Sequence, residues 1–137
     1  MYRKIMVPVD LAHIERLDKG ITTATDLAKH YGIPICFVGV TAETPTEVAH
    51  TPREFGEKLK QFGATQSTKH GLEIDTAAYA SHDPAVDLDD TLIAAAKENG
   101  ADLIVMASHV PGLPEHVFAS NAGAVASHAE VSVFVVR

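Results

Sequence analysis

The sequence lacks most of the features that mark secreted or membrane-spanning proteins. It contains one cysteine in 137 residues, so no disulfide can form within the chain. Because Cys36 lies in an apolar run, we expect a buried, unreactive thiol and a reducing compartment. No apolar run approaches the roughly 18 residues of a membrane-spanning helix, and no basic, apolar leader opens the sequence. We therefore expect a soluble, cytoplasmic protein with no membrane partner.

Positive charge is also scarce. The sequence has 11 Lys and Arg residues against 18 Asp and Glu residues, a formal net charge of −7. Non-specific binding to nucleic acid depends largely on neutralising phosphates, so this balance predicts no nucleic-acid partner. It remains compatible with a nucleotide, which needs only a few well-placed donors. The length and the 46% hydrophobic content suit one folded domain spanning residues 1–137.

Motifs of common enzyme classes are missing as well. There is no Gly-x-Ser-x-Gly elbow and no Walker motif, and no Gly-x-Gly-x-x-Gly follows the first apolar run. Ser108 and His109 are adjacent, and adjacent side chains usually point apart, so they make a poor nucleophile and base. His109 and His116 lack a third metal ligand at a suitable spacing. We expect neither an enzyme, beyond slow incidental hydrolysis of ATP, nor a dedicated metal site.

Apolar runs typical of buried strands alternate with segments of helical periodicity. The predicted strands are Lys4–Asp10, Ile35–Val40, Leu72–Ala80, Asp102–Met106 and Val131–Arg137. The predicted helices are His13–Tyr31, Pro52–His70, a segment from the cap Asp83-Pro84 to Asn99-Gly100, and a last one that starts near Ser120. The segment Thr41–Pro52 reads as a loop without structure of its own.

This alternation predicts an α/β fold. We expect a five-stranded parallel sheet of order 3-2-1-4-5 with helices on both faces, a Rossmann-like, doubly wound, three-layer α/β/α architecture. In such sheets ligands bind beyond the carboxyl ends of the strands, where the strand order reverses. That crevice would lie between the first and fourth strands, with Asp10 facing the segment Ala107–His109.

Three stretches carry a resemblance to a known family. They are Ile-Met-Val-Pro-Val-Asp at 5–10, Asp-Leu-Ile-Val-Met-Ala-Ser-His at 102–109, and the segment from Ser120 to the final Val-Ser-Val-Phe-Val-Val-Arg. In this order and spacing they resemble the universal stress protein family, and most of all its short, F-type branch. The resemblance covers the whole chain and is weakest between Thr41 and Asp83.

The resemblance implies a stress-response sensor or regulator that binds an adenine nucleotide, AMP or ATP, with Mg²⁺ as an optional companion. Adenine would lie against Val9 and Val40, and Asp10 would accept from the ribose hydroxyls or help to hold the Mg²⁺. The ribose and phosphates would meet the residues that follow the fourth strand. The implied nucleotide-binding residues are Pro8, Val9, Asp10, Val40, Met106, Ala107, Ser108, His109, Ala119, Ser120 and Asn121. Simpler roles stay open, because Asp10 and Ser120 also suit helix caps and Met106 also suits the core.

Nucleotide-binding members of the family carry Gly-x2-Gly-x9-Gly-Ser/Thr after the fourth strand. Here Ala107, Val110 and Ala119 stand in place of the glycines, although the F-type branch also has Ala-Ser-His at the first position. A Cβ obstructs both a positive φ and close approach of the backbone to a phosphate. No Lys or Arg lies between Asp102 and Val136, so AMP or adenosine is favoured over a triphosphate. The alternative function is a dimeric interaction module that has lost nucleotide binding.

The last strand also predicts a partner. The segment 131–137 is almost wholly apolar, and at a sheet edge its backbone groups would be unpaired. We expect a two-fold homodimer in which this strand pairs with its mate, antiparallel, as the resemblance also suggests. The alternative is that a helix or the loop 41–52 covers the edge.

Overall fold

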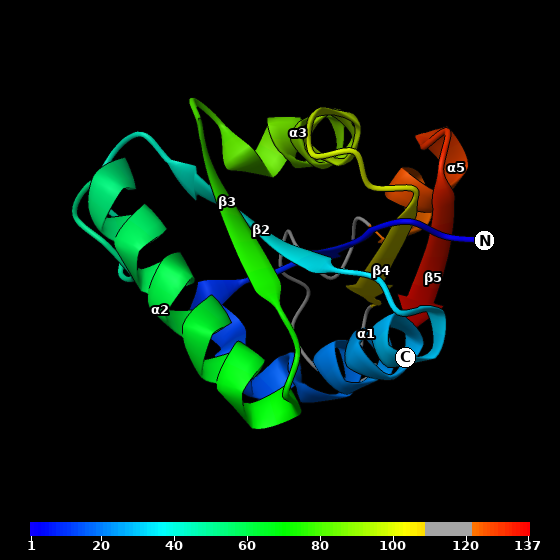
Figure 1. The fold of residues 1–137 in the computed structure, drawn as a ribbon. Coiled ribbons are helices and arrows are strands. Elements are labelled where there is room, and N and C mark those ends of the chain that lie inside the picture. Colours follow the sequence, from blue (N-terminus) through cyan, green and yellow to red (C-terminus); the bar gives the residue numbers. More distant parts are fainter. Residues whose placement is uncertain (109–121) are drawn as a thin grey trace.

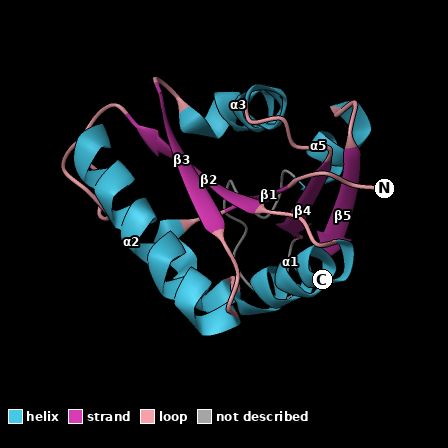
Figure 2. Cartoon of the chain, in the orientation of Figure 1, coloured by secondary structure: helices cyan, strands magenta, loops and turns pink. Residues whose placement is uncertain are grey.

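The computed structural model describes residues 1–108 and 122–137 of the chain, in which strands and helices alternate (Figure 2). The strands are β1 (Ile5–Pro8), β2 (Ile35–Ala42), β3 (Ile74–Ser81), β4 (Leu103–Ala107) and β5 (Ser132–Val136). The helices are the 3-10 helix η1 (Leu11–Arg16), α1 (Asp18–Tyr31), α2 (Pro52–His70), α3 (Pro84–Glu98) and α5 (Ala122–His128). Within the described part of the chain, no helix is both long enough and apolar enough to span a membrane.

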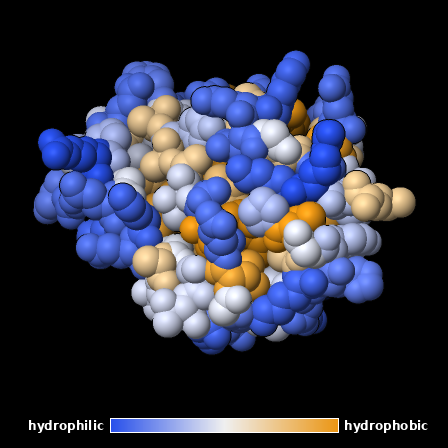
Figure 3. Space-filling view, in the orientation of Figure 1, coloured by the Kyte–Doolittle hydropathy of each residue, from blue (hydrophilic) through white to orange (hydrophobic). Residues whose placement is uncertain are grey.

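The predicted fold class is confirmed. The five strands form one parallel sheet of order β3-β2-β1-β4-β5. Helices α1 and α2 cover one face and α3 and α5 the other, which gives three layers (Figure 1). The helices are mostly hydrophilic outside, and hydrophobic residues gather near the middle of the visible face, over the sheet (Figure 3).

Each face of the sheet carries its own hydrophobic core. On the α1 and α2 side, Phe37 and Leu59 are fully buried, and on the α3 and α5 side Leu92 and Ile104 are. Cys36 lies in the second core and is a free thiol, as expected, and burial raises its pKa. The central strands β1, β2 and β4 are covered on both faces, which explains why their sequences are mostly apolar rather than alternating.

Glycines let α2 approach the sheet closely. A Cβ at Gly63 would come within 2.5 Å of the Thr76 Cγ2 atom in β3. A Cβ at Gly39 in β2 would come within 2.8 Å of the Phe55 ring in α2. Gly63 lowers the intrinsic helix propensity of this segment. It is accommodated because the absent side chain allows the helix to pack directly on β3.

Several predicted boundaries are wrong for identifiable reasons. The first α-helix begins at Asp18 instead of His13, because the Asp10 side chain caps a separate 3-10 helix and the backbone at His13 is non-helical. Strand β2 continues to Ala42, where it still pairs with Ser81 at the end of β3. Asp83 occupies the predicted cap position of α3, but its side chain makes no capping hydrogen bond.

Candidate functional site

A crevice opens between the carboxyl ends of β1 and β4. The two strands pair at Ile5 with Leu103 and at Met6 with Ile104. Beyond these positions each turns to its other neighbour: the Val9 N–H donates to the Val38 carbonyl at 2.8 Å, and the Ser108 N–H to the Val136 carbonyl at 2.8 Å. The strands therefore part at the point where the strand order reverses, where doubly wound sheets bind their ligands.

Asp10 follows β1 at the edge of this crevice, and contacts with Ala12 and His13 orient its carboxylate. Its Oδ1 atom accepts from the Ala12 N–H at 3.0 Å, and its Oδ2 atom lies 2.8 Å from the His13 Nδ1 atom. The side chain is 19% exposed, which leaves it accessible to a ligand. The capping role considered from the sequence is confirmed, and the cap also orients the carboxylate.

A pocket of about 220 Å³ lies beside Asp10, between the ends of β1 and β2. The sequence anticipated Asp10 and Val40 in its lining. It missed Thr41, Ala42, Phe55, Pro84 and the segment Thr46–Val48. Whole-ligand pockets usually measure roughly 300–1,000 Å³, so this one suits part of a ligand, such as a planar base with its sugar.

The other residues predicted to bind the nucleotide differ in how far they are buried. Val9 and Met106 are each 1% exposed and pack in the two cores, which agrees with the core role left open for Met106. Pro8 is also buried, while Ala107 and Ser108 are partly exposed at the end of β4. The anticipated residues outside the described part of the chain are His109, Ala119, Ser120 and Asn121, together with Val110.

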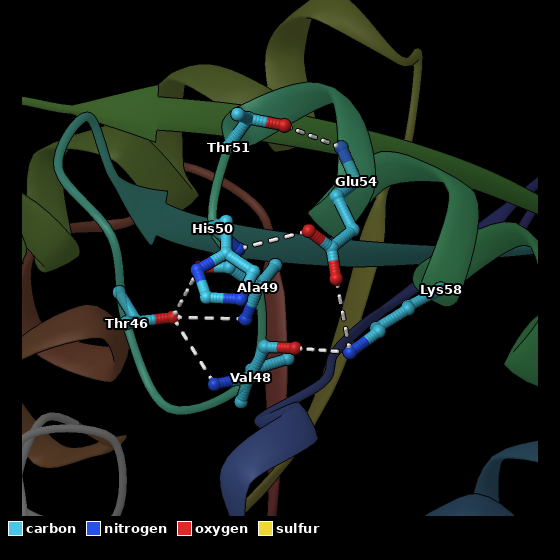
Figure 4. Close-up of polar contacts among 7 residues, drawn as sticks. All are labelled: Thr46, Val48, Ala49, His50, Thr51, Glu54 and Lys58. Carbon is cyan, nitrogen blue, oxygen red and sulfur yellow. Dashed lines mark hydrogen bonds and ion pairs between the residues drawn. The ribbon is translucent and has the colours of Figure 1, made fainter.

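The loop between β2 and α2 contains no helix or strand over residues 43–51, as predicted, and hydrogen bonds order it locally. The Thr46 Oγ1 atom accepts from the backbone N–H groups of Val48 and Ala49, both at 3.2 Å (Figure 4). The Thr51 hydroxyl accepts from the Glu54 N–H at 3.1 Å and caps α2. Thr51 and Glu54 have the spacing of a capping box, the signal by which the sequence could have revealed this order.

The described residues include no group of three or more His, Cys, Asp or Glu side chains placed to hold a metal ion. Asp10 and His13 form a pair without a third member in that part of the chain. A tetrahedral zinc site needs at least three protein ligands. The described residues by themselves therefore do not supply a tetrahedral zinc site.

Comparison with known proteins gives a family match over the whole chain. The model of the universal stress protein family matches residues 1–137. Universal stress protein G of Salmonella typhimurium and its namesake in Escherichia coli O157:H7 are each 32% identical over 142 residues, covering 100% of both sequences.

Solved structures share the fold at lower identity. A universal stress protein from Archaeoglobus fulgidus has a TM-score of 0.72 at 20% identity and covers 100% of both chains. A structure of the universal stress protein from Archaeoglobus fulgidus in complex with dAMP has a TM-score of 0.70 at 20% identity, covering 99% of this chain and 98% of that one. A family protein from Arabidopsis thaliana with AMP bound has a TM-score of 0.64 at 16% identity, covering 98% and 90%.

Proposed function

Because the chain belongs to the universal stress protein family, we propose that it binds an adenine nucleotide, AMP or ATP, and acts in the cytoplasm as a stress-response sensor or regulator rather than an enzyme. The observation that carries the proposal is the pocket between β1 and β2, with the oriented carboxylate of Asp10 at its edge. The relatives solved with dAMP and with AMP share this fold, which supports an adenine nucleotide as the ligand.

The lining of the pocket supports one arrangement of the proposed ligand. The base lies between Val40 and Phe55, whose apolar side chains line the pocket. The Asp10 carboxylate accepts hydrogen bonds from the ribose hydroxyls, and a hydrogen bond to a charged acceptor is among the stronger kind. The phosphates then extend toward Ser108 at the end of β4. If the ligand is ATP, its Mg²⁺ takes most of its oxygen ligands from phosphates and water, with Asp10 as one protein carboxylate.

Titration calorimetry with AMP and with ATP, with and without Mg²⁺, tests the proposal. Wild-type protein should bind, and Asp10→Asn, which keeps a capping oxygen but removes the charge, should bind at least about tenfold more weakly. Asp26→Asn, an exposed position on α1, is the matched control and should bind like wild type. No heat and no thermal shift at millimolar nucleotide would overturn nucleotide binding.

The second candidate is a dimeric interaction module without a nucleotide, and β5 favours it. This strand ends the sheet, and the Phe134 and Val135 side chains are 45% and 36% exposed. Its outer edge has no partner strand among the residues the structure describes. The loop 41–52 does not cover it, because that loop lies against η1 and α2. We propose an antiparallel pairing of β5 with a second copy, compatible with either function.

A further inference from the structure

One wall of the base pocket is an irregular turn. The segment Thr46–Val48 lines the pocket together with Val40, Phe55 and Pro84, which belong to regular elements. A turn makes few backbone hydrogen bonds to the rest of a protein, so side chains must fix its position. The contacts of this turn therefore decide whether the pocket has its shape before a ligand arrives.

Thr46 sets the local shape of the turn. Its N–H donates to the Ala49 carbonyl at 2.9 Å, and its Oγ1 atom accepts from the Val48 and Ala49 N–H groups. Ala49 is 5% exposed and packs in the core beneath α2. These bonds close the turn on itself but leave the Val48 carbonyl for another partner.

Lys58 ties the turn to α2. Its ammonium donates to the Val48 carbonyl oxygen and lies 3.4 Å from the Glu54 Oε1 atom (Figure 4). The other oxygen of Glu54 accepts from the His50 N–H at 3.0 Å. The hydrogen bond from His50, with a smaller contribution from Lys58, lowers the pKa of Glu54 despite some desolvation. The turn is thus fastened on both sides to the first two turns of one helix.

An unfilled hollow also borders the Thr46–Val48 turn on the side of Lys58. A second, more open hollow of about 570 Å³ shares Leu11, Ala12, Glu47 and Val48 with the base pocket. These four residues separate the two hollows, and Lys58 lines the larger one. That hollow gives the wall room to shift, and the Lys58 contact with the Val48 carbonyl is one of the bonds that oppose the shift.

We propose that Lys58 is a positioning residue for the nucleotide base: it holds the Val48 carbonyl and so keeps the Thr46–Val48 wall against the pocket. The proposal rests on the proposed function, since it concerns the same site. Lys58 does not need to touch the ligand. It raises the fraction of protein in which the pocket is already formed, and the apparent dissociation constant is the intrinsic one divided by that fraction.

Lys58→Met tests the proposal, because it keeps the aliphatic stem and removes the donor. The affinity for AMP should fall about 5- to 20-fold, and adenosine should lose the same factor because the turn faces the base rather than the phosphate. Lys58→Arg, which restores a cationic donor, should recover most of the affinity. Lys60→Met, at an exposed position on the same helix, is the control and should bind like wild type.

Amide hydrogen exchange without ligand supplies a second measurement. The amides of Val48 and Ala49 should exchange at least about tenfold faster in Lys58→Met, while those of β2 keep their protection. If Lys58→Met fails to fold, Thr46→Val opens the same turn from its other side and should show the same loss. Equal binding by wild type and Lys58→Met, or an equal loss in Lys60→Met, overturns the proposal. Absence of binding by wild type overturns the proposed function and this proposal together, so the two failures are distinguishable.

Discussion

The His13 ring and the Asp10 carboxylate meet at 2.8 Å across a single turn of η1, at the carboxyl end of β1. The two side chains are 31% and 19% exposed, so the pair is partly shielded from water. The contact joins Asp10, the predicted acceptor for the ribose hydroxyls, to the helix η1. The contact therefore helps to fix the direction of the carboxylate, and a pair that is only partly shielded contributes modestly to folding.

Replacing His13 with Ala should weaken AMP binding about 2- to 5-fold, since Asp10 loses a bond that helps to orient it. The free energy of unfolding should fall by no more than about 1 kcal/mol. Calorimetry and urea unfolding measure the two quantities. His30→Ala, at an exposed position on α1, is the control. An unchanged AMP affinity in His13→Ala would show that the His13 contact is not needed to orient the carboxylate.

Two glycines in α2 should respond in opposite ways to alanine. Gly63→Ala places a Cβ 2.5 Å from the Thr76 Cγ2 atom and should destabilise the fold by about 1–3 kcal/mol. Gly56→Ala meets its nearest neighbour, the Ala78 Cβ, at an ordinary 3.6 Å. It should stabilise the helix by about 0.5–1 kcal/mol. Urea unfolding of both variants checks the contrast, and a Gly63→Ala protein as stable as wild type would contradict it.

The stability of the protein should depend on His70 below neutral pH. Burial, helped by Lys69 and Lys29, lowers the pKa of His70 from its ordinary value of 6.5. Its Nε2 atom is buried and has no hydrogen-bond partner in residues 1–108 or 122–137. The unfolded chain therefore binds this proton first, so stability is fully present above pH 6.5 and falls as the pH drops toward the lower pKa of the folded state.

His70→Gln should flatten that dependence. The measurement is the urea midpoint of wild type and variant at a series of pH values on both sides of 6.5. The difference between the two curves isolates His70 from the other histidines. Parallel curves for the two proteins would mean that His70 accepts its proton in the folded state as readily as in the unfolded one.

A charge on β5 should separate the proposed dimer. Phe134→Lys puts an ammonium on a side chain that is 45% exposed at the end of the sheet. It should convert a dimer to a monomer in sedimentation equilibrium at micromolar concentration, because an edge lysine opposes strand pairing. Val86→Lys, on α3 at a side chain 75% exposed, should leave the association unchanged. A wild-type protein that sediments as a monomer would contradict the proposed dimer.

Strands β1, β2 and β4 could be predicted because each is a nearly continuous apolar run, a pattern that can be recognised without knowledge of the neighbouring strands. Asp10 could be predicted because it directly follows such a run. The pocket wall could not, since it depends on Lys58, which lies 10 residues beyond the Val48 carbonyl it binds. The start of α1 could not be predicted for a related reason. The spacing of apolar residues indicates which face of a helix is buried, but it does not indicate that the Asp10 side chain caps the separate helix η1 before α1 begins.

Phe55 connects the size of the pocket with the packing of α2 on the sheet. Its ring lines the pocket and also covers Gly39 so closely that a methyl group there would lie 2.8 Å from it. A bulkier guest would have to displace an aromatic group that has no room to retreat toward the strand. A change at Phe55 should therefore alter both the shape of the pocket and the packing of α2 on β2.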